Sequence, residues 1–134
     1  MNVKAACLFA FYVISVFLHI LPEEGTPADK LKNVLDYIEI HYAQTISVEE
    51  LAKICCFSEY HFMRFFKSAM GTSFTSYLSS YRLSMAARLL MLTNDSILDI
   101  ALSCGYENLS YFNRSFKKRY KKTPSEYRRG SDET

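Results

Sequence analysis

The sequence contains little of what builds strands, turns or metal sites. Its 134 residues include only four glycines and three prolines, and no run of strand length alternates apolar and polar side chains. Helical spacing of apolar side chains dominates from Leu31 onward. About half of the residues (49%) are apolar, which excludes a disordered chain. We therefore expect an all-α protein, large enough to bury a core without disulfides or metal ions.

Patterns typical of metal sites and enzymes are also missing. The four cysteines, Cys7, Cys55, Cys56 and Cys104, show no Cys-x-x-Cys spacing, and no histidine lies at ligand spacing from them. We interpret them as reduced residues of a cytoplasmic protein, with Cys55 and Cys104 in the core. The histidines are scattered, no nucleophile is paired with a base, and no glycine-rich loop could cradle a phosphate. The sequence predicts no enzyme, no metal ion and no cofactor.

Charge is distributed unevenly along the chain, although its formal net value is only +2. Residues 58–129 contain twelve basic and five acidic side chains, whereas residues 1–57 contain four lysines and seven acids. A basic half of this kind suits a polyanionic partner.

One pattern occurs twice, in residues 47–70 and again in residues 96–120: a short capped helix, a tight turn and a second helix with Phe-Lys near its end. In the first copy Ser47 and Glu50 form a predicted capping box, and Ser58 is placed to cap the second helix. Phenylalanines at 62, 65 and 66 should point inward.

The second copy has Ser96 and Asp99 as its box, a turn at residues 105–107 and Asn108 as the cap. The offset is 50 residues from Phe62 to Phe112 but 49 from Ala52 to Ala101, so the second turn carries one extra residue. Two helices crossed through a short turn suit a helix-turn-helix DNA reader. A single copy would fit an ordinary helical bundle with a solvated basic face equally well. Two copies in register favour a DNA-binding helix-turn-helix protein.

The longest predicted helix lies between the two copies. Gly71 ends the preceding helix, Thr72 or Ser73 caps the next, and an apolar face continues as far as Thr93. We expect that face to comprise Phe74, Leu78, Tyr81, Met85, Leu89 and Leu92. About 20 residues make a rod of about 30 Å, close to the roughly 34–36 Å between successive major grooves. One chain could then read two adjacent grooves.

The two ends of the chain differ. Residues 5–21 are apolar apart from Ser15 and His19. Three interpretations compete: a signal peptide, a membrane anchor, and a helix that packs on another domain or on a second copy of the chain. We favour the packed helix. An amphipathic helix follows over residues 28–42, and a short last helix begins at Thr123-Pro124 and runs to Arg129. The expected organisation is residues 1–27 as apolar helix and linker, 28–130 as the tandem domain and 131–134 as a tail.

These stretches resemble a known family. The segments ISVEELAK, GTSF, SILDIALSCGYENLSYFNRSFKKRY and TPSEYR are similar to the DNA-binding domain of AraC/XylS-type transcriptional regulators, over about residues 31–129. The resemblance implies two helix-turn-helix subdomains joined by a long central helix, about seven helices, with the apolar N-terminal helix as an extra. It also implies a sequence-specific regulator, often an activator, with double-stranded DNA and RNA polymerase as partners.

Carried over by position, the resemblance assigns one set of DNA-contacting residues to each copy. The first set is Ser58, Tyr60, His61, Met63, Arg64 and Lys67, and the second is Asn108, Leu109, Ser110, Tyr111, Asn113, Arg114, Lys117 and Lys118. Arg64 and Arg114 are the expected base readers, because arginine can grip guanine with two hydrogen bonds. Lysines would bind phosphates.

The chain departs from the family at two turns and at its beginning. Cys56 and Lys121 stand where the family often has glycine, and a positive φ there would cost on the order of 1 kcal/mol. Family members commonly carry an effector-binding domain, and only 30 residues precede the match here. Residues 5–21 could be the end of such a domain, which suggests a truncated start, or a self-association segment. The alternative function is a membrane-tethered or protein-docking helical module that uses residues 5–21.

Overall fold

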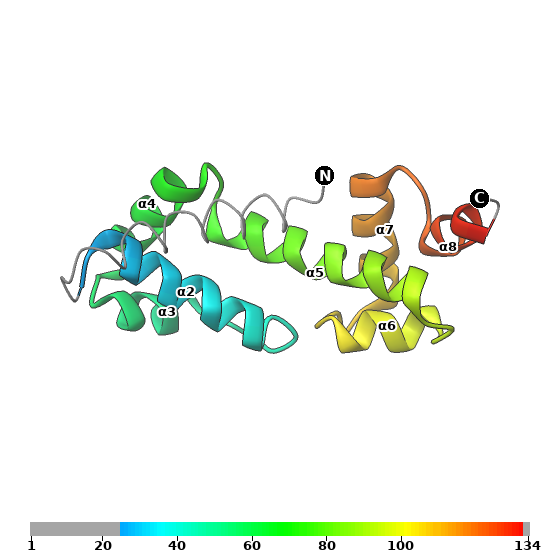
Figure 1. Cartoon of the computed structure of the whole chain (residues 1–134), viewed down its shortest axis with the longest axis horizontal. Coiled ribbons are helices and arrows are strands. Elements are labelled where there is room, and N and C mark those ends of the chain that lie inside the picture. Colours follow the sequence, from blue (N-terminus) through cyan, green and yellow to red (C-terminus); the bar gives the residue numbers. More distant parts are fainter. Residues whose placement is uncertain (1–24, 133–134) are drawn as a thin grey trace. The chain divides into compact units, whose positions relative to one another are not determined.

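The chain folds into helices joined by short turns (Figure 1). The computed structural model describes residues 25–132, and side chains as far as residue 130. Within this range the helices are α2 (Pro27–His41), α3 (Val48–Cys55), α4 (Glu59–Met70), α5 (Phe74–Leu92), α6 (Ile97–Ser103), α7 (Leu109–Tyr120) and α8 (Pro124–Asp132). The all-α prediction is confirmed, and α8 runs past the expected end at Arg129. The helix expected in residues 5–21 lies outside the described residues.

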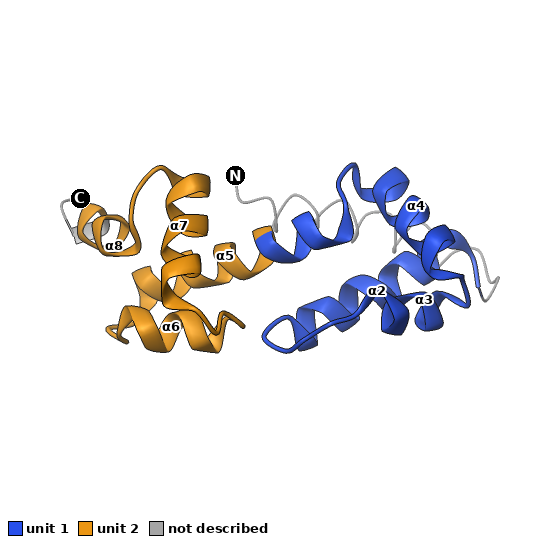
Figure 2. Cartoon of the chain, turned by 180° about the vertical axis from the view of Figure 1, so that it is seen from behind, with its two compact units in different colours: residues 1–79 blue, residues 80–134 orange. Residues whose placement is uncertain are grey.

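Two compact units divide the chain between Ser79 and Ser80, inside α5 (Figure 2). Unit 1 contains α2, α3, α4 and the first turns of α5. Unit 2 contains the rest of α5 together with α6, α7 and α8. Among these helices, none is long and apolar enough to cross a membrane.

The internal repeat extends beyond the two turn motifs. Val34, Leu35 and Ile38 of α2 are buried, and the residues 52 positions later, Ala86, Ala87 and Leu90 of α5, are buried too. The second half of α5 thus contributes buried side chains to unit 2 at the positions that correspond to those of α2 in unit 1.

The same correspondence links the start of α5 to α8. Tyr77 packs edge-on against Phe66 with ring centroids 5.5 Å apart, and Tyr127 packs in the same way on Phe116 at 5.4 Å. Each unit is therefore a four-helix repeat, of which the sequence revealed the middle pair. Helix α5 is shared: it ends the first repeat and begins the second.

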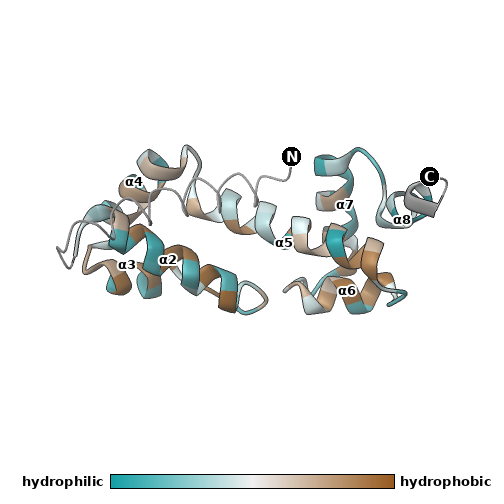
Figure 3. Cartoon of the chain, viewed as in Figure 1, coloured by the Kyte–Doolittle hydropathy of each residue, from teal (hydrophilic) through white to brown (hydrophobic). Residues whose placement is uncertain are grey.

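This sharing explains why the apolar face predicted for α5 is wrong towards its end. Leu92 is 70% exposed, and Met85 and Leu89 are only half-buried. From Ser80 onward the buried side chains are instead Tyr81, Leu83, Ser84, Ala86, Ala87 and Leu90. A single apolar face along the whole helix was expected. Because α5 contributes to the cores of two units, a different set of its residues is buried in each unit. The ribbon towards the end of α5 is brown in Figure 3, which marks hydrophobic residues there.

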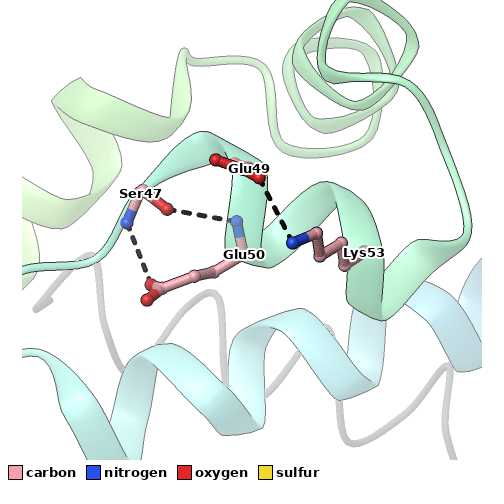
Figure 4. Close-up of polar contacts among 4 residues, drawn as sticks. All are labelled: Ser47, Glu49, Glu50 and Lys53. Atoms are coloured by element: carbon pink, nitrogen blue, oxygen red, sulfur yellow. Dashed lines mark hydrogen bonds and ion pairs between the residues drawn. The ribbon is translucent and has the colours of Figure 1, made fainter.

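Local capping holds the helix starts as the sequence predicts. The Ser47 hydroxyl accepts from the Glu50 N–H and the Glu50 carboxylate accepts from the Ser47 N–H, each at 3.1 Å (Figure 4). Thr123 and Glu126 form the same reciprocal box at 3.0 and 3.2 Å. At Ser96, where the same box with Asp99 was expected, the structure shows one of its two hydrogen bonds: the Ser96 hydroxyl accepts from the Asp99 N–H at 3.0 Å.

The start of α5 and the interior of unit 1 refine two further expectations. Ser73 rather than Thr72 caps α5, because its hydroxyl accepts from the Ser76 N–H at 3.3 Å. Phe62 is fully buried as expected, whereas Phe65 is only half-buried and meets the ring of Phe57 edge-on.

The two motif turns share one hydrogen-bond pattern, which ends each helix with a left-handed residue. In the first, the Cys56 N–H donates to the Lys53 carbonyl at 3.1 Å and the Phe57 N–H to Ala52 at 2.9 Å. In the second, Gly105 donates to Leu102 at 3.1 Å and Tyr106 to Ala101 at 2.9 Å. The 49-residue offset holds through Tyr106, so the extra residue is Glu107.

Four of the turns that follow helices contain a left-handed residue, and glycine fills only two of these four positions. Cys56 has φ of 57° where Gly105 has 94°, and Lys121 has φ of 63° where Gly71 has 74°. Each unit therefore has glycine at one of its two turns and a side chain at the other. The strain expected at Cys56 and Lys121 is a consequence of this geometry.

Candidate nucleic-acid interface

Helix α4 buries one side and exposes the other. Phe62 and Phe66 are fully buried, and their spacing of four residues turns the opposite face outward. The predicted first set, Ser58, Tyr60, His61, Met63, Arg64 and Lys67, is exposed throughout. Part of this face borders an open hollow of about 510 Å³ lined by Tyr60, His61, Arg64, Phe65, Ser68 and Ala69.

Helix α7 has the same construction, with Phe112 and Phe116 fully buried. Exposed members of the predicted second set are Asn108, Ser110, Tyr111, Arg114, Lys117 and Lys118. Leu109 and Asn113 are half-buried, so they present less of their side chains than expected. The predicted residues thus gather on one helix face in each unit.

Both helices begin with a side-chain cap. The Ser58 hydroxyl accepts from the His61 N–H at 3.1 Å, and the Asn108 carbonyl oxygen accepts from the Tyr111 N–H at 2.9 Å. Ser58 keeps its hydroxyl proton, and Asn108 keeps its amide donors, for an external acceptor. These helix starts are suited to an anion such as a phosphate.

The two arginines expected to read bases are held differently. Arg64 donates from Nη1 to the Tyr60 hydroxyl at 3.1 Å, and its guanidinium carbon lies 5.6 Å from the centroid of the Tyr60 ring. Fifty residues later the tyrosine is replaced by Ser110. Among the described residues, Arg114 makes no hydrogen bond or ion pair.

Lys30 is a residue of unit 1 that the sequence did not point to. Its Nζ donates to the Cys55 carbonyl at the end of α3 at 2.9 Å and lies 4.3 Å from the centroid of the Phe57 ring. His61 of α4 also stacks on that ring, at 4.0 Å. Lys30 therefore ties α2 to the turn that leads into α4, and a cation at a helix C-terminus is favourable.

Not every basic residue of unit 2 is available to a partner. Arg128 of α8 caps the end of α5: Nε donates to the Leu90 carbonyl at 3.1 Å, and Nη2 to those of Thr93 and Asp95 at 3.4 and 2.7 Å. Arg119 is half-buried and donates to the Ser80 hydroxyl at 3.1 Å. The basic side chains that α7 and the following turn leave exposed are Arg114, Lys117, Lys118, Lys121 and Lys122.

The described cysteines are free thiols, and two of them belong to the core. Cys55 and Cys104 are fully buried at corresponding places, and burial raises the pKa of each thiol. A raised pKa keeps a thiol protonated and unreactive. Within residues 25–132, no three His, Cys, Asp or Glu side chains are grouped so that they could hold a metal ion.

Known relatives match most of the described region. The chain is 38% identical over 98 residues to the HTH-type transcriptional regulator YbfP of Bacillus subtilis, covering 73% of this chain and 33% of that protein. It is 36% identical over 102 residues to the transcriptional regulator Rob of Salmonella typhimurium, covering 76% and 35%. The chain thus spans about a third of the length of these two relatives.

Solved structures show the same architecture. The DNA-binding domain of AdpA, in complex with a target DNA, matches with a TM-score of 0.71 at 27% identity, over 75% of this chain and 91% of that one. The C-terminal domain of AraT, a response regulator from Geobacillus stearothermophilus, matches with a TM-score of 0.72 at 31% identity, over 81% and 88%.

The family model of a helix-turn-helix domain matches residues 51–130, which is more than half of the chain. It includes the second motif and all of the first motif after residue 50. A regulator from Chromobacterium violaceum described as containing an AraC-type DNA-binding domain is also similar, with a TM-score of 0.71 at 28% identity over 76% of this chain and 91% of that one. The chain belongs to the AraC-type helix-turn-helix family of transcriptional regulators.

Proposed function

We propose that this chain binds double-stranded DNA sequence-specifically as a transcriptional regulator, and that α4 and α7 enter successive major grooves. The observation that carries the proposal is the repeat itself. Two copies of one buried scaffold each present a capped helix whose outward face is polar and cationic. The similarity to the AdpA domain, which was solved with its target DNA, supports this partner.

Each exposed face offers chemistry for bases and for phosphates. Arg64 and Arg114 can each grip the O6 and N7 of a guanine, and Asn113 can pair with an adenine. Tyr60 and Met63 can contact thymine methyl groups or sugars. The two helix starts and the lysines at 67, 117 and 118 bind phosphates, which fixes the register of the protein on the duplex.

The spacing of the two readers is part of the proposal. Helix α5 has 19 residues and belongs to both units. At 1.5 Å per residue it is about 28 Å long, which is comparable with the roughly 34–36 Å between successive grooves on one face of B-DNA. A single chain would then present two reading helices where many helix-turn-helix proteins need a dimer.

The assignment of residues 28–130 as one DNA-binding domain follows from the same proposal. A protein that reads genomic DNA works in the compartment that holds it, so we infer a cytoplasmic chain with reduced thiols. RNA polymerase and an effector-binding domain stay as predictions from the family resemblance. The alternative of a docking module that uses residues 5–21 concerns a segment outside the described residues.

Selection from random duplexes, followed by footprinting, tests the proposal. We expect one recovered site protected over two neighbouring major grooves, with binding that weakens steeply as salt rises. Arg64→Ala should relax the preference at one end of the site and Arg114→Ala at the other. Lys53→Ala is the control, because Lys53 is exposed on α3 and paired with Glu49 at 3.2 Å. Recovery of no preferred duplex would overturn the proposal.

A further inference from the structure

The two reading helices are not equivalent, and the first difference lies in their arginines. Tyr60 holds Arg64 through a 3.1 Å hydrogen bond and an aromatic face, whereas the matching pair in α7 is Ser110 and Arg114. Serine is too short to reach a guanidinium one helical turn away. An arginine held before binding loses less side-chain entropy when it docks on a base.

The hydrogen bond to Tyr60 does not exhaust the donors of Arg64. A guanidinium has five N–H groups in a planar fork, and the tyrosine hydroxyl takes one of them at Nη1. Nη2 and Nε stay available for a guanine. Tyr60 is 69% exposed and packs in no core, so its side chain is available to hold Arg64.

The second difference is charge. Residues 25–79 contain five basic and six acidic side chains, whereas residues 80–132 contain ten basic and five acidic ones. Around the reading helices, α4 exposes Lys67 followed by Ser68, and the matching positions of α7 expose Lys117 and Lys118. Lys121 and Lys122 extend this second row. Electrostatic attraction for the phosphates therefore concentrates on unit 2.

We propose that the two units divide the work of DNA binding. Unit 1 sets most of the sequence preference through Arg64, with Tyr60 as its positioning residue. Unit 2 supplies most of the salt-dependent affinity through the lysines that follow Arg114. This division rests on the proposed function, because it takes α4 and α7 as the helices that meet DNA.

Tyr60→Phe isolates the positioning role, because it removes the hydroxyl and keeps the ring. We expect the preference for the selected base at the Arg64 end of the site to fall about two- to tenfold, the range of one hydrogen bond. The dependence of log K on log salt should be unchanged, since the variant neutralises as many phosphates as the wild type. Ser110→Tyr builds the matching pair in α7 and should raise the preference at the opposite end.

A matched set of lysine variants tests the electrostatic half. Lys117→Gln combined with Lys118→Gln should lower the salt slope by about 0.9 for each phosphate that the chain no longer neutralises, without altering base preference. The matching change in unit 1 is Lys67→Gln alone, with a decrease of about 0.9 at most. Fluorescence anisotropy of a labelled selected duplex at several salt concentrations measures both quantities.

The outcomes separate this inference from the proposed function. If the wild-type chain selects no duplex, the proposed function itself fails. If it selects one, but Tyr60→Phe keeps the full preference at the Arg64 end, Tyr60 is not a positioning residue. An unaltered preference after Ser110→Tyr also contradicts that role. Equal decreases in slope from Lys67→Gln and from the Lys117 and Lys118 double variant contradict the division of affinity.

Discussion

Replacing Cys56 with glycine should stabilise the protein, which is the reverse of what most substitutions do. Cys56 has φ of 57° and ψ of 36°, a left-handed conformation that costs an L-residue about 1–2 kcal/mol relative to the right-handed one. Glycine has no such cost, but its greater conformational freedom in the unfolded chain reduces the gain in stability by about 0.4–1 kcal/mol. The expected net gain in the free energy of unfolding is about 0.5–1 kcal/mol.

The surroundings of Cys56 leave this estimate uncomplicated. Its side chain is exposed, and the hydrogen bonds of the turn come from backbone N–H groups that glycine also has. Gly105 stands at the same left-handed position of the second repeat. Cys56→Gly therefore gives the first turn the residue that the second already has.

Urea unfolding followed by circular dichroism measures the effect, as a higher midpoint with an unchanged slope. Cys56→Ala is the matched control, because it removes the thiol and keeps the left-handed cost. Gly71→Ala is the mirror test: its φ is 74° and a Cβ there would meet no atom within 4 Å, so the destabilisation should come from the backbone alone. If Cys56→Gly is no more stable than Cys56→Ala, the reasoning about strain is refuted.

Three further predictions concern unit 2. Lys121→Gly should stabilise the protein less than Cys56→Gly, because it also removes the hydrogen bond from Lys121 Nζ to the Lys118 carbonyl at 3.1 Å. Thermal unfolding compares the two variants, and an equal or larger gain in stability from Lys121→Gly would contradict this. Arg128→Met should lower the free energy of unfolding by about 1–3 kcal/mol, because three carbonyl oxygens lose their donor, whereas the exposed Arg129→Met should change it little. Burial raises the pKa of Cys104 above its ordinary 9.0, so the folded chain keeps a proton that the unfolded chain releases. Stability should therefore fall as pH rises above about 9, and Cys104→Ala should flatten that dependence in urea titrations; an unaltered slope would contradict it.

The helix starts and the exposed faces of α4 and α7 could be predicted from the sequence. Capping by Ser47, Ser58 and Asn108 depends on residues three positions apart, and the burial of Phe62 and Phe112 depends on helical periodicity. Both are local relations. The family resemblance also pointed to the two turns at which a side chain replaces glycine.

Other features required the packed structure. The apolar face of α5 was mispredicted at Leu92 because one helix serves two cores, and periodicity cannot say where one core ends. The matching of α2 to the second half of α5 was missed, since each of its three buried pairs combines two different residue types.

The count of basic residues along the chain has the same limit, because it does not show which side chains make contacts within the fold. Arg128 is one of the twelve basic side chains in residues 58–129, yet it caps α5 through carbonyls 33 to 38 residues earlier in the chain. The sequence by itself determined which segments are helical and which faces of α4 and α7 are apolar, because those depend on neighbours within one turn. Only the tertiary structure decided which cations stay free for a partner, because a side chain is engaged or free according to contacts made across the fold.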